Sequence, residues 1–224
     1  MTNIGNRRFA LCGVVAVLLL STSSAFAQMD FSGNWASLFH EDQPERLPGP
    51  EVGDYIALPI NDAARAKARA WSASLLTLPE HQCKPHPAAY GYRGPSTMRI
   101  QQDVDRDTQR VRKITIYFEW MQQLREVWMD GRARPSAYAP HTWQGFSTGR
   151  WDGDTLVVTT THLKAGWVRR NGVPYSDRAV FTDSWRRHGD YISHVASLDD
   201  PVYLTEPFVR TTNWVWAPAQ QIQA

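Results

Sequence analysis

The residues with the clearest potential for chemistry are a carboxylate and a guanidinium in two neighbouring strand-like segments. If the chain turns around Gln122, Glu119 and Arg125 lie directly opposite each other on one sheet face, and Tyr117 pairs with Val127. On an inward face, such an ion pair can hold a polar ligand group or raise the proton affinity of the carboxylate. On an outward face it is a solvated pair that contributes less than about 1 kcal/mol. The sequence is compatible with both placements.

Histidines supply the second candidate group for proton transfer. His162 ends a strand-like segment whose positions from 156 to 160 alternate, so it points inward if the alternation continues. An enzyme built from these residues would use Glu119 as acid or base, Arg125 to orient it or bind an anion, and His141 or His162 to move the second proton. An inward histidine is, in the simpler interpretation, a hydrogen-bonded core residue.

Two segments have donor spacings that suggest a metal. His81, Cys83 and His86 could contribute three ligands to zinc or copper, although a fourth must come from elsewhere and a lone cysteine packed under a loop is the commoner arrangement. Asp103–Asp107 resembles the start of a calcium loop but lacks the glycine and the bidentate glutamate that such loops use. We therefore expect a hairpin turn at 103–107 and no metal or other cofactor.

Gly145–Gly149 matches G-x-S-x-G, the pattern around the nucleophile of α/β-hydrolases. Asp183 and His188 follow Ser147 in the chain order that a catalytic triad of that class requires. However, the segment after Gly149 indicates a turn into a strand, where the hydrolase pattern requires a helix. The motif is better explained as a glycine-containing bend at the corner of a sheet.

The N-terminal segment predicts export. Arg7 and Arg8 precede a largely apolar run, Phe9–Leu20, and Ala25–Ala27 completes an A-x-A pattern, so we expect a signal peptide cleaved after Ala27. The apolar run is too short to span about 30 Å of hydrocarbon. The mature protein would be periplasmic or secreted, by the general or the twin-arginine route, without stable membrane insertion. It would hold 22 basic and 22 acidic residues, which disfavours nucleic acid as a partner, and Cys83 would be its only thiol.

The rest of the chain predicts a single β-rich domain over residues 28–224. Asn61 is placed to cap a helix over roughly 62–77, where apolar residues recur at helical spacing until Pro79. From residue 97 onward, about eight short strands alternate with turn signals such as Asp152-Gly153. We expect an all-β, mainly antiparallel fold, either a β-barrel or a barrel-like sandwich, with that one helix.

Two patterns resemble known families. Gly33-Asn34-Trp35, just after the signal segment, resembles the G-x-W of lipocalins and related calycin barrels. That resemblance implies a tryptophan that closes the barrel floor against a late arginine, with Arg186, Arg187 and Arg210 as candidates. The motifs in 128–160 and 200–207, including D-G-R and W-x-G-x-S-x-G-x-W-x-G-D-T-L-V-V, resemble an uncharacterised exported bacterial family. Relatives often have histidine where this chain has Arg134.

The ten tryptophans carry the functional prediction. Aromatic rings distributed along short strands favour an apolar interior that binds a small apolar or aromatic molecule. The alternatives are an enzyme (lyase, isomerase or hydrolase) on the same barrel, or a protein-interaction module with its tryptophans outside. The sequence leaves the oligomeric state open. The residues expected to contact the ligand are Trp35, Tyr117, Trp128, Trp143 and Trp151.

Overall fold

The computed structural model describes residues 29–42, 51–79, 84–169 and 171–220. The expected signal peptide at 1–27 lies outside the described residues, as do His81 and Cys83 of the candidate metal site. Within the described part of the chain, no helix combines the length and apolarity needed to cross a membrane.

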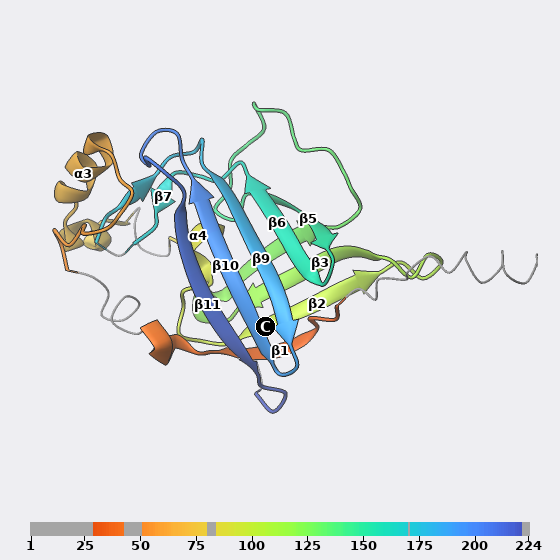
Figure 1. Ribbon diagram of the computed structural model, residues 1–224. Coiled ribbons are helices and arrows are strands. Elements are labelled where there is room, and N and C mark those ends of the chain that lie inside the picture. Colours follow the sequence, from red (N-terminus) through yellow and green to blue (C-terminus); the bar gives the residue numbers. More distant parts are fainter. Residues whose placement is uncertain (1–28, 43–50, 80–83, 170, 221–224) are drawn as a thin grey trace, which may run out of the picture.

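Nine strands form a closed barrel (Figure 1). Their order around the barrel is β1-β11-β10-β9-β6-β5-β4-β3-β2. All neighbouring pairs are antiparallel except β4 and β5, which run parallel, with Val127 paired to Ser147 and Trp128 paired to Thr148. The expected all-β, mainly antiparallel fold is confirmed, and it is a barrel, not a sandwich. The strands are β1 Gly33–Ser37, β2 Met98–Val104, β3 Val111–Phe118, β4 Gln123–Trp128, β5 Phe146–Asp152, β6 Thr155–Thr161, β9 Val180–His188, β10 Tyr191–Asp199 and β11 Phe208–Trp216.

Local turn chemistry sets two of the tight hairpins. Gly153 (φ 60°) joins β5 to β6 and Gly189 (φ 59°) joins β9 to β10, both in the left-handed region that glycine adopts without penalty. Along β9 and β10, buried and less buried residues alternate, as the period of two requires. The Asp152-Gly153 signal therefore places the β5–β6 hairpin as expected.

The helix is shorter than predicted. α3 spans Asp62–Arg69, and its N-cap Asn61 accepts a hydrogen bond from the Ala64 backbone N–H at 3.0 Å, as expected. The 3-10 helix η2, Ala73–Thr77, replaces the rest of the predicted helix, because Ser72 is extended and caps this second element. Short elements complete the described chain: η1 Phe39–Asp42, α4 Ala88–Gly91, η4 Trp120–Gln122, and the two-stranded sheet of β7 Gly166–Trp167 and β8 Pro174–Tyr175.

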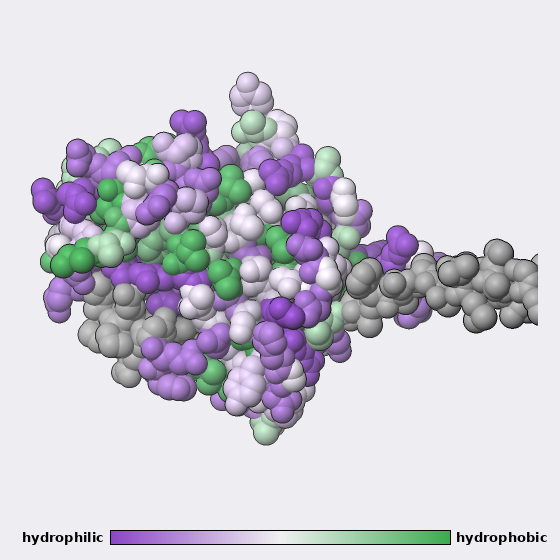
Figure 2. Space-filling view, in the orientation of Figure 1, coloured by the Kyte–Doolittle hydropathy of each residue, from purple (hydrophilic) through white to green (hydrophobic). Residues whose placement is uncertain are grey.

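Large aromatic side chains fill much of the barrel interior. Trp35, Trp185 and Trp214 are among the largest fully buried side chains and belong to one continuous core. Among the three candidate arginines, Arg187 is the one positioned over Trp35, with its guanidinium carbon 5.1 Å from the ring centre. On the face shown in Figure 2, hydrophobic residues are interspersed with polar ones.

Candidate functional site

A group of polar side chains lies inside the barrel, on the inward faces of five strands. Arg125 comes from β4, Ser147 from β5, Thr160 from β6, Asp183 from β9 and His194 from β10. All five are buried, with at most 1% of their surface exposed. Charged groups are rarely buried to this degree unless they are paired, because removing them from water is costly.

Arg125 is the centre of this buried cluster. Its Nη1 and Nη2 donate to the two carboxylate oxygens of Asp183 at 2.7 and 2.8 Å, which is the bidentate geometry of a strong ion pair. Nη2 also donates to Thr160 Oγ1 at 2.8 Å, and Nε donates to Ser147 Oγ at 3.3 Å. The guanidinium carbon lies 5.3 Å from the ring centre of Phe181. Arg125 thereby ties β4 to β9 through the interior.

Asp183 accepts two further hydrogen bonds. The Trp185 Nε1–H and His194 Nε2 contact its Oδ2 at 2.8 and 3.1 Å. Burial by itself raises the pKa of this carboxyl, but the Arg125 charge and the hydrogen bonds from Arg125 and His194 outweigh it. The pKa of Asp183 is therefore held well below its usual range, and the group is a carboxylate.

The carboxylate in turn fixes the tautomer of His194. An ionised Asp183 accepts only, so His194 Nε2 must carry the shared hydrogen. Burial lowers the pKa of His194, against the opposing effect of its hydrogen bond to Asp183, and this favours the neutral ring. In that tautomer Nδ1 is an acceptor, and it is buried without a hydrogen-bond partner, as is the indole N–H of Trp214.

The segment around α4 closes one end of the barrel. The Tyr92 ring, which follows α4, stacks on Phe181 of β9 at 6.0 Å and meets His194 of β10 edge-on at 4.6 Å. Arg93 donates to the Thr211 carbonyl of β11 at 3.4 Å. A Cβ placed on Gly91 would lie 3.2 Å from the Gln123 side chain at the start of β4. These contacts reach strands on opposite sides of the barrel, so the segment lies across its end.

The expected opposition of Glu119 and Arg125 is wrong. Phe118 pairs with Gln123, which leaves a four-residue connection at 119–122 and places Arg125 opposite Ile116. Tyr117 pairs with Leu124 and not with Val127 for the same reason. Glu119 instead accepts a hydrogen bond from Thr97 Oγ1 at 2.6 Å. Arg125 does face inward, but its acidic partner is Asp183.

His141 and His162 lie together, away from the buried cluster. Their ring centres are 5.2 Å apart. His141 Nδ1 contacts the Leu163 carbonyl and His162 Nε2 contacts the Ser136 carbonyl, both at 2.9 Å. The expected inward direction of His162 is wrong: β6 ends at Thr161, His162 adopts φ 58°, and Leu163 is the buried residue.

The five predicted ligand-contacting aromatics do not gather at one site. Trp35 donates to the Phe31 carbonyl at 2.9 Å and Trp151 stacks on the Phe31 ring at 5.9 Å, so these two share a region. Tyr117 alternates with buried residues of β3 and faces outward. Trp128 is half-buried, and the guanidinium carbon of Arg132 lies 3.4 Å from its ring centre.

Two lysine side chains lie against the ring of Trp143. The ammonium groups of Lys84 and Lys164 lie 4.9 and 5.5 Å from its centre. Burial lowers the pKa of Lys84, which also lies 4.4 Å from the Trp167 ring centre. Trp143 is therefore part of a surface cluster of aromatic rings and lysines.

The Ser147 and Asp105 motifs have structural explanations, whereas only His86 of the candidate metal site lies in the described part of the chain. Ser147 lies within β5 and its hydroxyl pairs with Thr160 at 2.7 Å, so the strand-to-helix turn of a hydrolase is not formed there. Asp105 caps its own turn by accepting from the Thr108 backbone and hydroxyl groups. His86 packs against Tyr90 with ring centres 4.9 Å apart. Among the described residues, no three acidic, histidine or cysteine side chains group as a metal site.

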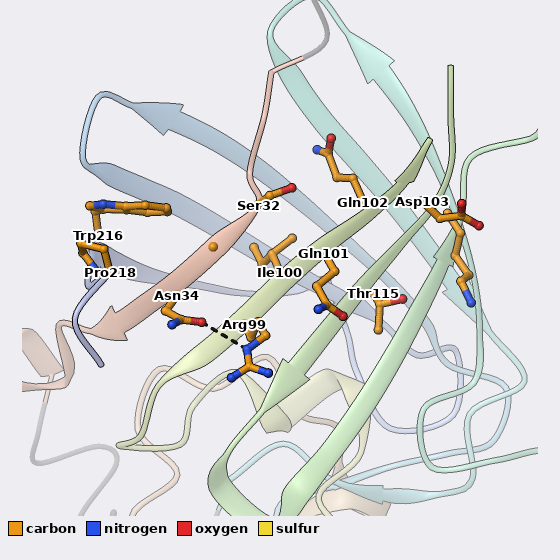
Figure 3. A pocket seen from close by; sticks show the side chains of 12 residues that line it. Ser32, Asn34, Arg99, Ile100, Gln101, Gln102, Asp103, Thr115, Trp216 and Pro218 are labelled. Carbon is orange, nitrogen blue, oxygen red and sulfur yellow. Dashed lines mark hydrogen bonds between the residues drawn. The ribbon is translucent and has the colours of Figure 1, made fainter. Parts of the chain in front are cut away.

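A separate groove lies at strands β1–β3. It has a volume of about 830 Å³, and it is lined by outward-facing side chains such as Arg99 and Gln101 as well as by the inward-facing Ile100, with Trp216 and Pro218 at one side (Figure 3). Arg99 Nε donates to Asn34 Oδ1 at 3.3 Å within it, and Gln101 and Thr115 lie on the same side of the sheet. Its amide, hydroxyl and charged groups suit a polar ligand, whereas the barrel interior is predominantly aromatic and aliphatic.

Sequence reasoning found Arg125 but gave no role to His194 and treated Asp183 only as a triad partner. A usable signal was present, because the period of two along β9 and β10 places Asp183 beside Phe181 and Trp185, and His194 beside Ile192, on the inward face. Their meeting with Arg125 depends on closure of the barrel.

Comparisons of the chain with protein-family models, curated proteins and solved structures give no match.

Proposed function

We propose that this chain is an exported β-barrel protein that binds a small aromatic or apolar molecule inside its barrel, at the end closed by α4. The observation that carries the proposal is the position of Tyr92. Its ring comes from a segment outside the barrel strands and lies inside against Phe181 and His194. The interior thus accepts an aromatic ring delivered from this end, and a ligand ring can take the same place.

The surroundings of Tyr92 fit an aromatic guest. Phe181 offers a parallel ring face, with an interplanar angle of 11° to Tyr92, and His194 presents a ring at 74°. Such stacked and edge-on contacts contribute about 0.5–1.5 kcal/mol beyond the burial of the rings. The polar cluster beneath supplies orientation, as a few convergent polar groups do in apolar ligand sites.

A second candidate function is acid–base catalysis, and the Asp183–His194 contact favours it. A carboxylate that holds one histidine nitrogen leaves the other as a base of fixed direction, which is how histidine bases are commonly positioned. In this alternative, Glu119 has no part beside Arg125, since the two are not paired. His194 would be the base.

Calorimetric titration with 2-naphthol tests the binding function. The wild-type protein should bind one equivalent, and Tyr92→Ala should bind about 10- to 100-fold more tightly, because the ligand no longer displaces a buried ring worth about 1.5–3 kcal/mol. The matched control is Tyr138→Ala, since Tyr138 is 96% exposed. It should leave the affinity unchanged.

The decisive measurement is whether the wild-type protein binds 2-naphthol. Truncating a buried ring can create a hole that binds aromatic molecules in any protein. Binding by Tyr92→Ala alone, with none by the wild-type chain, would therefore contradict the proposal.

A further inference from the structure

We infer that the molecule bound inside the barrel carries a hydroxyl group that donates its hydrogen to His194 Nδ1. This inference rests on the proposed function and adds the chemical class of the ligand, a hydroxylated aromatic such as a phenol or naphthol. It is carried by a buried acceptor of fixed direction on the wall of the site.

The acceptor character of Nδ1 follows from the contacts of the other ring nitrogen. Nε2 lies 3.1 Å from Asp183 Oδ2, and that carboxylate also receives hydrogen bonds from Arg125 and Trp185. A fully paired carboxylate beside Arg125 accepts and does not donate, so Nε2 bears the hydrogen and Nδ1 bears the lone pair. Nδ1 is buried and has no hydrogen-bond partner.

Leaving a polar atom buried and unpaired costs about 1–3 kcal/mol, so a ligand that pairs it gains a comparable advantage. The Tyr92 ring approaches His194 edge-on at 4.6 Å, so a guest that replaces Tyr92 is adjacent to this imidazole. Trp185 packs against the same imidazole at 4.0 Å and restrains its orientation. The direction of the Nδ1 lone pair is therefore set before the ligand arrives.

The neighbouring strand carries a second buried polar group, which is a donor. Trp214 of β11 is paired with Ile192, one inward position from His194, and its buried Nε1–H has no hydrogen-bond partner. A hydroxyl is the smallest group that donates and accepts together. An ether accepts only and a hydrocarbon does neither. Comparing a hydroxyl, an ether and a hydrocarbon ligand therefore separates the hydrogen bond that the ligand donates from the one that it accepts.

Three matched probes test the inference on the wild-type protein: 2-naphthol, 2-methoxynaphthalene and naphthalene, each titrated by calorimetry. We expect 2-naphthol to bind about 10- to 100-fold more tightly than the other two. Equal affinities for 2-naphthol and 2-methoxynaphthalene would overturn the hydroxyl donor while the binding function stands. Failure of all three probes to bind would overturn the proposed function itself.

His194→Phe assigns the preference to the imidazole. The variant keeps a ring against Trp185 but lacks the acceptor, so the preference for 2-naphthol over 2-methoxynaphthalene should fall to about 2-fold or less. The matched control, His188→Phe at the exposed β9–β10 turn, should keep the full preference. An undiminished preference in folded His194→Phe would overturn the inference.

A pH series on the wild-type protein gives a second measurement that does not depend on the variant's folding. Protonation of His194 removes the acceptor, so the preference for 2-naphthol should decline on acidification. The charged and titratable groups that act on this ring are Asp183, Arg125, Arg93 and Tyr92. Because the pKa of His194 is lowered, the decline should begin below its ordinary value of about 6.5. A preference that stays constant through the acid range, while the protein remains folded, would overturn the inference.

Discussion

Replacing Arg125 by methionine should destabilise the barrel more than any comparable change at its surface. The substitution removes both hydrogen bonds to Asp183 and the single bonds to Ser147 and Thr160. Asp183 keeps only its contacts with Trp185 and His194 and loses its compensating charge. Removing one partner of a buried ion pair costs about 3–5 kcal/mol, because the other charge is left uncompensated away from water.

The assay is urea unfolding followed by far-UV circular dichroism at pH 8 and pH 5. The loss in free energy of unfolding should be smaller at pH 5, because an Asp183 without Arg125 has a raised pKa and relieves its burial by taking up a proton. Asp183→Asn in the Arg125→Met background should recover part of the loss, since a neutral amide needs no counter-charge. The two costs should therefore be non-additive, as expected for residues in direct contact.

Arg186→Met is the matched control. Arg186 also lies on the barrel and pairs with Asp154 at 2.8 Å, but about half of each side chain is exposed to solvent. An exposed pair of this kind contributes at most about 1 kcal/mol. If Arg125→Met costs no more than Arg186→Met, or its cost does not depend on pH, the assignment of a charged, buried Arg125–Asp183 pair is wrong.

Two further predictions concern pH and helix capping. The free energy of unfolding should fall in two stages on acidification. It should fall first below about pH 6.5, where His194 takes up a proton more readily in the unfolded chain than in the folded one, and again below about pH 3.9, where the same is true of Asp183. A series of thermal melts measures this, and a flat profile from pH 7 to 5 would contradict the neutral His194. Asn61→Ala should cost about 1 kcal/mol through loss of the α3 cap and of the bond from Asn61 Nδ2 to the Val202 carbonyl. Urea unfolding of this variant beside the wild type measures the cost, and an unchanged midpoint would contradict it.

Features set by neighbouring residues were predictable. The glycine turn at Gly153 and the cap at Asn61 are present as expected, and the period-two alternation along β9 and β10 is likewise a property of adjacent residues. The end of α3 was not, because the extended Ser72 begins η2 in place of a further helical turn. An extended cap residue inside an otherwise periodic stretch is not visible in the spacing of apolar residues.

The candidate site was predictable only in part, for reasons of register. The alternation in β4 shows that Arg125, Gln123 and Val127 share one face, but it does not say which residue they face. A four-residue connection at 119–122 moved Glu119 out of the pair. One change in connection length therefore altered every opposing partner along β3 and β4.

By itself, the sequence determined a β-rich chain with inward and outward faces, because alternation and turn residues are properties of adjacent positions. Only the tertiary structure decided that the sheet closes, that β4 and β5 run parallel, and that Arg125 meets Asp183, 58 residues away. Closure brings β4 and β9 to facing sides of one interior, and the cost of burying either charge alone makes their pairing necessary. The partner of a buried charge is thus fixed by the geometry of the closed barrel and not by the residues beside it in the chain.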